Sequence, residues 1–237
     1  VMYYRKECTS CGRCVEACPV GAIRPTPEKG FVTDHNRCTL CGRCVEACFV
    51  GARKIIGESL SPEQLMGEIR KDAGYYRESG GGVTISGGEP LLQPELLVAL
   101  LAECRKEGIH TALETAAHVP WEILAGLLPW LDLLYIDLKH IDSDRHRSFT
   151  GVPLRLIKDN IQRAGREFSN LIVRIPVVPG FNAEAGVFQR IFSFLAETDV
   201  TTVELLPFHR LGLAKYEGLG LTYAMKEVPN LDKESCE

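Results

Sequence analysis

A cysteine motif that occurs twice constrains this chain more than any other feature. Residues 8–23 read CTSCGRCVEACPVGAI and residues 38–53 read CTLCGRCVEACFVGAR, so the period is 30 residues. Each copy contains C-x₂-C-x₂-C-x₃-C, a spacing that holds [4Fe–4S] clusters, with the fourth ligand supplied by the other copy. The expected ligands are Cys8, Cys11, Cys14 and Cys48 for a first cluster, and Cys38, Cys41, Cys44 and Cys18 for a second.

Other uses of the cysteines fit this pattern less well. Nothing in the sequence suggests secretion, and duplicated triplets leave no simple disulfide pairing. Zinc would need only four ligands in paired C-x₂-C units, so the third and fourth cysteines of each run would be redundant. The isolated Cys104 and Cys236 are read as ordinary buried or surface thiols. Residues 1–57 are therefore predicted to form a ferredoxin-like domain that carries two [4Fe–4S] clusters and transfers electrons.

The remaining residues, 58–237, are long enough for a second, larger domain. The formal net charge of −4 gives no general attraction for nucleic acid or anionic membranes. No apolar run is long enough to span a bilayer, and no secretory segment opens the chain. Because cluster ligation needs reduced thiols, we expect a cytoplasmic protein. From its charge and the lack of a long apolar run, we expect no nucleic-acid or membrane partner.

The second domain alternates strand and helix patterns. Ser61 and Gln64 form a capping box, with Pro62 at the first helical position, and begin a helix expected to reach Tyr76. Short β-branched runs predict strands at 83–86, 110–114, 133–138, 171–177 and 202–207, and amphipathic segments predict helices at 94–108, 120–128, 153–168 and 184–197. This alternation predicts an α/β fold with a parallel sheet, either open and doubly wound or a whole or partial barrel.

Polar or glycine residues follow each predicted strand, at the edge where active sites of parallel α/β folds lie. They are Gly87, Gly88 and Glu89, then Glu114 and Thr115, then Asp137 and Lys139, then Arg174, and finally His209. Solvation explains a single charge at a strand end, but five strands contributing together indicate a ligand site.

Most of these residues also allow a plainer interpretation. The Gly87-Gly88 pair lets the backbone approach a ligand, and Glu89 can accept from an ammonium, yet the same segment suits an ordinary tight turn. Asp137 and Lys139 share one face of a strand, which suits either a zwitterionic ligand or an internal ion pair.

Three further features carry less information. Arg174 in an apolar strand needs an anionic ligand or a buried acid. His209 can contact a ribose or a base, or belong to an ordinary loop. The group His140, Asp142, Asp144 and His146 resembles a metal site, but Asp142 as a helix cap is the more economical interpretation.

The motifs SGGEP, LET, DLKH, RIPVVPGFN and LLPFHRLGLAKY, together with the double-cluster segment, resemble those of the glycyl-radical-enzyme activating enzymes. These are radical S-adenosylmethionine (SAM) proteins related to the pyruvate formate-lyase activase. The resemblance covers essentially the whole chain and is nearest to the activases with two extra clusters. It implies a partial (β/α)₆ barrel, reductive cleavage of SAM to a 5′-deoxyadenosyl radical, and hydrogen abstraction from a glycine of a partner glycyl radical enzyme. A flavodoxin- or ferredoxin-type protein would donate the electron.

The resemblance also implies roles for individual residues. The SAM site would comprise Gly87, Gly88, Glu89, Asp137, Leu138, Lys139, Arg174 and His209. Glu114, Thr115 and Asp137 fall where the pyruvate formate-lyase activase binds a monovalent cation, although Glu114 replaces an aspartate.

The chain departs from the family at one position that matters. The C-x₃-C-x₂-C motif, which holds the radical-generating third cluster, is absent from the sequence. We expect it, with a first strand, to precede Val1 in a longer protein, and we expect this chain alone not to cleave SAM. Two alternatives stay open: an iron–sulfur electron-transfer or partner-binding module, and a radical SAM enzyme acting on another substrate.

Overall fold

The computed structural model describes residues 1–232 and 234, which fall into two compact units. The cysteine unit comprises residues 1–59 and 209–230, and the sheet unit comprises residues 60–208 and the described residues from Leu231. The first boundary lies near the predicted one, at 57/58. Residues 209–230 differ, because the sequence assigns them to the second domain whereas the structure packs them with the cysteines.

The cysteine unit reproduces its sequence repeat in three dimensions. One copy contains helix α1 (Arg13–Glu16) and strand β2 (Ile23–Thr26), and the other contains α2 (Arg43–Glu46) and β4 (Arg53–Lys54). Strand β1 (Met2–Tyr3) pairs antiparallel with β4, and β3 (Gly30–Thr33) pairs antiparallel with β2. A 3₁₀ turn, η1 (Arg5–Glu7), precedes the first cysteine. The turn-rich segment 25–30 thus forms the tip of the β2–β3 hairpin.

Helix α10 (Leu213–Gly218) joins the cysteine unit through contacts between residues far apart in sequence. It packs against β1, and Gly218 lies against Met2. Lys29 Nζ donates to the carbonyl of Gly220 at 3.0 Å, and a ring nitrogen of His35 lies 3.1 Å from the carbonyl of Leu219. No local sequence pattern in residues 209–230 predicts these long-range contacts, so the sequence analysis assigned the segment to the other domain.

The sheet unit contains five parallel strands in sequential order, β5-β6-β7-β8-β9. Their bounds are β5 (Gly82–Ile85), β6 (His110–Thr115), β7 (Leu133–Asp137), β8 (Leu171–Val177) and β9 (Thr202–Pro207). Helices connect consecutive strands. They are α5 (Pro94–Lys106) between β5 and β6, α6 (Trp121–Ala125) between β6 and β7, α7 (Ser143–Thr150) and α8 (Arg155–Glu167) between β7 and β8, and α9 (Ala185–Ala196) between β8 and β9. Sequential order without reversal is that of a singly wound, partial (β/α) barrel, because a doubly wound sheet reverses its strand order.

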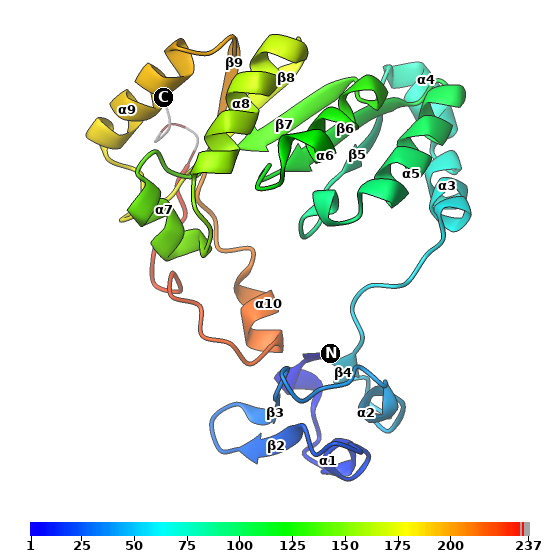
Figure 1. Cartoon of the computed structure of the whole chain (residues 1–237). Coiled ribbons are helices and arrows are strands. Elements are labelled where there is room, and N and C mark those ends of the chain that lie inside the picture. The colour runs from blue at the N-terminus through cyan, green and yellow to red at the C-terminus, as the bar shows by residue number, and fades with distance from the viewer. Residues whose placement is uncertain (233, 235–237) are drawn as a thin grey trace. The chain divides into compact units, whose positions relative to one another are not determined.

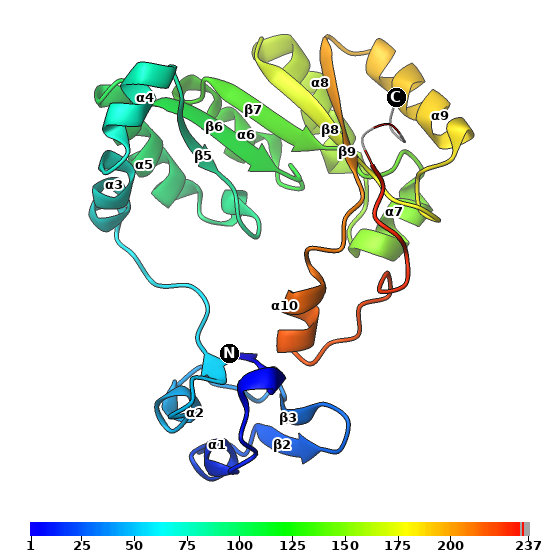
Figure 2. The same cartoon turned by 180° about the vertical axis from the view of Figure 1, so that it is seen from behind.

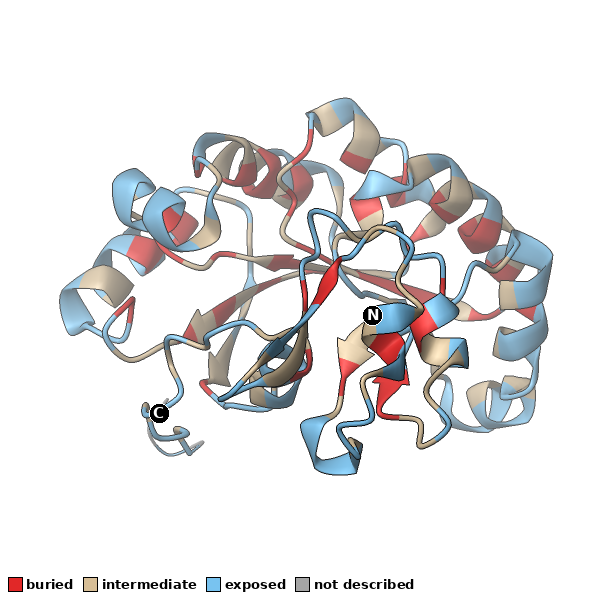
Figure 3. Ribbon diagram, turned by 90° about the horizontal axis from the view of Figure 1, so that it is seen from below, coloured by how far each residue is buried: buried red, intermediate tan, exposed pale blue. Residues whose placement is uncertain are grey.

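The helices cover one face of this sheet (Figure 1), and Figure 2 shows the strands from the opposite side. Alternate strand residues, among them Leu113, Ile136 and Val173, pack with Ile157 and Ile161 of α8 in the main apolar core. Burial is concentrated on the strands and on the helix surfaces that face them (Figure 3). Since successive strand residues point to opposite faces, the polar residues between these positions lie on the face without helices.

The predicted strands agree with the structure to within a residue or two, and the helices differ more. The capping box of Ser61 is present, with Gln64 N donating to Ser61 Oγ at 3.2 Å, but the helix ends at Arg70 as α3 (Pro62–Arg70). A second helix, α4 (Ala73–Ser79), follows after Asp72, a poor residue for a helix interior. The short 3₁₀ turns η2 (Pro90–Leu92) and η3 (Leu128–Trp130) complete the unit. Among the described residues, no helix is both long and apolar enough to cross a membrane.

Candidate functional site

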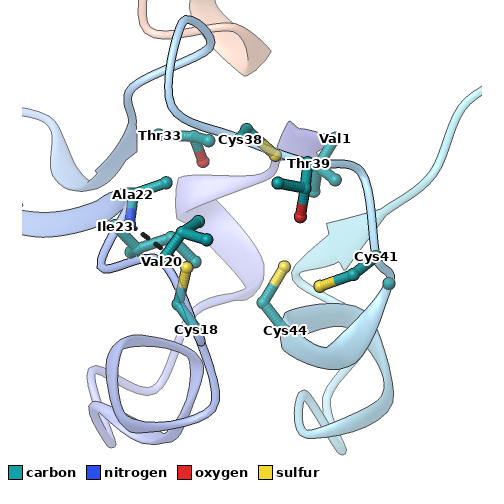
Figure 4. Close-up of a pocket in the computed structure, with 11 residues that line it drawn as sticks. Val1, Cys18, Val20, Ala22, Ile23, Thr33, Cys38, Thr39, Cys41 and Cys44 are labelled. Carbon is teal, nitrogen blue, oxygen red and sulfur yellow. Dashed lines mark hydrogen bonds between the residues drawn. The ribbon is translucent and has the colours of Figure 1, made fainter.

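The first of two cysteine-lined cavities in the cysteine unit joins both copies of the repeat. Cys38, Cys41 and Cys44 come from the second copy and Cys18 comes from the first, and their sulfurs point into a common space (Figure 4). The space that protein atoms leave free there, counting the part that is open to solvent, is about 320 Å³. Apolar side chains, including Val1, Val20 and Ile23, line the rest of this cavity.

The other cavity has the reciprocal composition. Cys8, Cys11 and Cys14 of the first copy line it together with Cys48 of the second, around about 310 Å³ of free space. Each cavity thus combines the three closely spaced cysteines of one copy with the last cysteine of the other. This is the arrangement that two cubane clusters with exchanged fourth ligands require.

Among residues 1–232 and 234, no three His, Cys, Asp or Glu side chains lie close enough together to hold one metal ion. Four thiolates that each bind a different iron of a cube need not converge on one point. The absence of a single-ion site in the described part is therefore compatible with the two cavities.

A buried charge provides an independent test of whether an anionic cluster fits. Arg53 is only 1 % exposed and lines the cavity of Cys8 and Cys48. Its Nη atoms donate to Thr33 Oγ1 at 2.8 Å and to the carbonyl of Phe31 at 2.6 Å, while Nε has no partner. Within the described residues no carboxylate pairs with this guanidinium, and a buried unpaired cation is costly. A negatively charged iron–sulfur cluster in the cavity would supply the missing countercharge.

Backbone N–H groups favour the thiolate form of Cys18, the cysteine that the first copy contributes to the cavity of the second. Burial alone would raise the pKa of the Cys18 thiol, but backbone N–H groups lower it, among them that of Ala22 at 3.2 Å from the sulfur. By contrast, burial raises the pKa of Cys44, and the charge of Arg53 offsets this only in part. The thiolate is the form that binds iron, so Cys18 is well prepared as a ligand.

In the sheet unit, four charged side chains form one network at the strand ends. Arg174 Nη1 lies 2.9 Å from Glu114 Oε1 and its Nε lies 3.4 Å from Asp137 Oδ1. Lys139 Nζ contacts the other oxygen, Asp137 Oδ2, at 2.9 Å. The guanidinium also lies over the ring of Tyr135, at 4.8 Å. The network has two acids and two bases, so it is balanced without a ligand.

This network settles the partner of Arg174. Burial alone would lower the pKa of the guanidinium, but hydrogen bonds and charges from Glu114 and Asp137 raise it above its ordinary value. The structure gives Arg174 acid partners, Glu114 and Asp137, although both are only partly buried. Lys139 remains about one-third exposed, which leaves it accessible to a ligand at the same edge.

The SGGEP segment is held by its glutamate. Glu89 Oε1 accepts from Thr115 Oγ1 at 2.6 Å and from Leu91 N at 3.1 Å, and Oε2 accepts from Ala116 N at 2.9 Å. All these donors belong to the protein, so the carboxylate connects the loop after β5 to the end of β6. Gly87, at φ +131°, has a backbone conformation that side chains disfavour, and a Cβ at Gly87 or Gly88 would meet open space.

Several expected site residues lie elsewhere or face elsewhere. The Leu138 side chain is fully buried in the main core, so only its main chain can face a ligand. The three residues of the expected cation site have protein partners, because Glu114 and Asp137 hold Arg174 while the Thr115 hydroxyl donates to Glu89. His209 is exposed and belongs to the cysteine unit rather than to the sheet unit.

The possible metal site after β7 has a structural explanation. Asp142 caps α7 by accepting from Asp144 N and Arg145 N, as the sequence favoured. The ring of His140 accepts from Asp142 N at 2.9 Å, and a ring nitrogen of His146 lies 2.9 Å from the carbonyl of Val152.

Two buried asparagines that sequence reasoning missed position the strand-end loops. Asn160 Nδ2 donates to the carbonyls of Ala117 and Val119, in the loop after β6. Asn182 Nδ2 donates to the carbonyls of Lys139 and Pro176, linking the ends of β7 and β8. Asn160 lies on the apolar face of the amphipathic helix α8. A polar residue on such a face needs a buried hydrogen-bond partner, and this is the signal that could have identified it from the sequence.

Comparison with known proteins agrees with this geometry. The Radical SAM superfamily matches residues 35–187, and the 4Fe-4S dicluster domain matches residues 7–52. The chain is 42 % identical to the (2S)-3-sulfopropanediol dehydratase activating enzyme of Klebsiella oxytoca, over 95 % of this chain and 73 % of that protein. It is 36 % identical to the choline trimethylamine-lyase activating enzyme of Oleidesulfovibrio alaskensis, over 100 % of this chain and 78 % of that protein.

A solved structure supports the same relationship. A domain of the pyruvate-formate lyase-activating enzyme from Bacteroides vulgatus is 33 % identical with a TM-score of 0.54, and the match covers 66 % of this chain and 88 % of that one. With two cysteine cavities, a singly wound parallel sheet and relatives of this kind, the chain belongs to the radical SAM superfamily and, within it, to the activating enzymes of glycyl radical enzymes.

Proposed function

We propose that this chain acts in the activation of a glycyl radical enzyme, as the family's reaction implies. A reduced third cluster, for which this chain has no C-x₃-C-x₂-C motif, would together with SAM supply a one-electron cleavage to the 5′-deoxyadenosyl radical. That radical would take a hydrogen atom from a glycine of the partner. The protein's part is to bind, orient and shield. The observation that carries the proposal is the gathering of Gly87, Gly88, Asp137 and Lys139 at one edge of a parallel sheet.

The strand-end residues divide the work of binding SAM. We infer that the Gly87-Gly88 backbone receives the amino-acid part of SAM, since no side chain stands between the main chain and the ligand. Asp137 and Lys139, an acid and a base on one face, suit the ammonium and the carboxylate of that zwitterion. Glu89 and Arg174 are positioning residues. Glu89 holds the Gly87-Gly88 loop against the end of β6, and Arg174 holds the carboxylate of Asp137. The role expected for His209 at the nucleoside stays a prediction from the resemblance, because His209 belongs to the cysteine unit.

The cysteine unit holds two clusters in this proposal. Cys8, Cys11, Cys14 and Cys48 would bind the first, and Cys38, Cys41, Cys44 and Cys18 the second, as the linings of the two cavities support. Basic side chains outnumber acidic ones in this unit, 12 to 8, although the whole chain has a net charge of −4. The negative charge of two thiolate-bound clusters would offset that excess, so a flavodoxin- or ferredoxin-type electron donor is proposed from the family's reaction alone. Reduced thiols also favour a cytoplasmic setting.

The test begins with the metal content and SAM binding of the chain itself. Reconstituted anaerobically with iron and sulfide, it should hold about eight irons on the two-cluster assignment. It should bind SAM in equilibrium dialysis, but release no 5′-deoxyadenosine under dithionite, because its sequence contains no C-x₃-C-x₂-C motif. Release of 5′-deoxyadenosine would contradict the need for that motif.

The same measurements separate the proposal from its main alternative. An electron-transfer or partner-binding module would hold the irons without binding SAM, and replacing Asp137 would change nothing. On our proposal, Asp137→Asn weakens SAM binding at least about tenfold, because a charge-assisted contact to the ammonium is lost. Iron content should stay the same in this variant, since Asp137 lies outside the cysteine unit.

A further inference from the structure

The two cysteine cavities are related residue by residue through the 30-residue repeat, so their differences are informative. Besides the cysteines, Thr9, Gly12, Val50 and Ala52 of one cavity correspond to Thr39, Gly42, Val20 and Ala22 of the other. The linings differ in kind at three corresponding pairs, which are Arg53 and Ile23, Tyr3 and Thr33, and Phe31 and Val1. Only the first pair differs in charge.

The strand pairing explains how such different side chains occupy equivalent places. Tyr3 pairs with Arg53 across β1 and β4, and Thr33 pairs with Ile23 across β3 and β2. Ile23 is 4 % exposed and Arg53 is 1 % exposed, so each position is an interior one. The cavity of Cys8, Cys11, Cys14 and Cys48 therefore has a buried cation where the other cavity has a hydrocarbon side chain.

The guanidinium is fixed beside its cavity. Two hydrogen bonds hold its Nη atoms, and its plane lies over the Tyr3 ring at 5.0 Å. The third nitrogen, Nε, is buried without a partner. A fixed positive charge and a free N–H group are the features by which a protein stabilises added negative charge on a cluster.

Reduction of a [4Fe–4S] cluster adds one electron and no proton, so the cluster becomes more negative by one charge. A buried cation favours that change, because Coulomb interactions are strong where water is excluded. An apolar wall gives no such help. We propose that Arg53 makes the cluster of Cys8, Cys11, Cys14 and Cys48 the higher-potential cluster of the pair.

This inference rests on the proposed ligand assignment. It predicts that an electron shared by the two clusters resides mainly beside Arg53, while the cluster in the apolar cavity is the stronger reductant. Arg53 Nη1 also touches Thr33, which lines the other cavity. The charge therefore reaches the second cluster as well, but Arg53 itself lines only the cavity of Cys8, Cys11, Cys14 and Cys48. The shift of the second cluster on removing the charge should therefore be smaller.

The test is a redox titration, followed by electron paramagnetic resonance, of the reconstituted chain and two variants. Arg53→Met removes the buried charge at similar volume. Lys54→Met is the matched control, because it removes a charge from the adjacent, exposed residue of the same strand. In Arg53→Met the higher-potential step should fall by at least a tenfold change in its equilibrium constant, which is 59 mV for a one-electron couple. The lower-potential step should move less, and Lys54→Met should leave both steps nearly unchanged.

Iron analysis keeps the two proposals distinguishable. A parent chain with about four irons would refute the two-cluster assignment, whereas about eight irons with equal titrations of Arg53→Met and Lys54→Met would refute only the role of Arg53. A shift confined to the lower-potential step, or equal shifts of both, would also overturn it. If Arg53→Met loses iron, Arg53→Gln, which keeps a donor toward the carbonyl of Phe31, is titrated in its place.

Discussion

Replacing Asn160 by alanine tests how the loop after β6 is held at the edge of the sheet. The Asn160 side chain is 1 % exposed, and its amide donates to the carbonyls of Ala117 and Val119 at 2.8 and 2.9 Å. Ala117, at φ +51°, is in the left-handed region and fully buried, a conformation that the surroundings must maintain. The same short loop carries the Ala116 N–H that binds Glu89.

The expected loss of stability follows from the two carbonyls. A buried acceptor that loses its donor costs about 1–3 kcal/mol. With two such acceptors and partial relaxation of the loop, Asn160→Ala should lower the free energy of unfolding by about 3 kcal/mol. This loss corresponds to a more than hundredfold change in the unfolding equilibrium constant, at about 1.4 kcal/mol per factor of ten.

Urea unfolding followed by tryptophan fluorescence measures this directly. Both tryptophans, Trp121 and Trp130, lie in the sheet unit, so the signal reports on that unit. Asn170→Ala is the matched control, since its amide makes one exposed hydrogen bond to the carbonyl of Asp132. The control should lose well under 1 kcal/mol. Equal losses in the two variants, within about 0.5 kcal/mol, would refute the role given to Asn160.

Three further predictions test other parts of the chain. Cys18→Ala should reduce the iron content by about half, with loss of the cluster expected at Cys38, Cys41 and Cys44; selective loss of the Cys8 cluster, seen by electron paramagnetic resonance, would contradict the exchanged ligands. Glu89→Gln should weaken SAM binding several-fold, because an amide cannot accept from both Ala116 N and Leu91 N while keeping Thr115 as a donor; unchanged affinity in equilibrium dialysis would show that the loop is held by other contacts. Ser61→Ala should cost the sheet unit about 1 kcal/mol through loss of the capping box of α3, and an unchanged urea midpoint would show that the cap contributes nothing.

The sequence alone predicted the features that depend on residues close together in the chain. Cysteines two or three residues apart must reach one cluster, so the spacing of Cys8, Cys11 and Cys14 was readable without a fold. The strands were predicted well because their β-branched runs are short, apolar and bounded by glycine or polar residues. Alternation along β7 likewise put Asp137 and Lys139 on one face, and the structure joins them at 2.9 Å.

Long-range pairing decided the rest. Arg174 finds Glu114, 60 residues away, only because β6, β7 and β8 are neighbours in the sheet. Glu89 turns to the loop after β6 for the same reason, and residues 209–230 pack with cysteines that lie near the other end of the chain. Arg53 shows this most clearly, since a charged residue at the end of the second cysteine repeat is expected to be solvated, and only the contacts of β4 with β1 and β3 bury it beside a cavity. Sequence determined which side chains can do the chemistry, and tertiary packing determined which of them are free to do it, because only packing sets burial and partners.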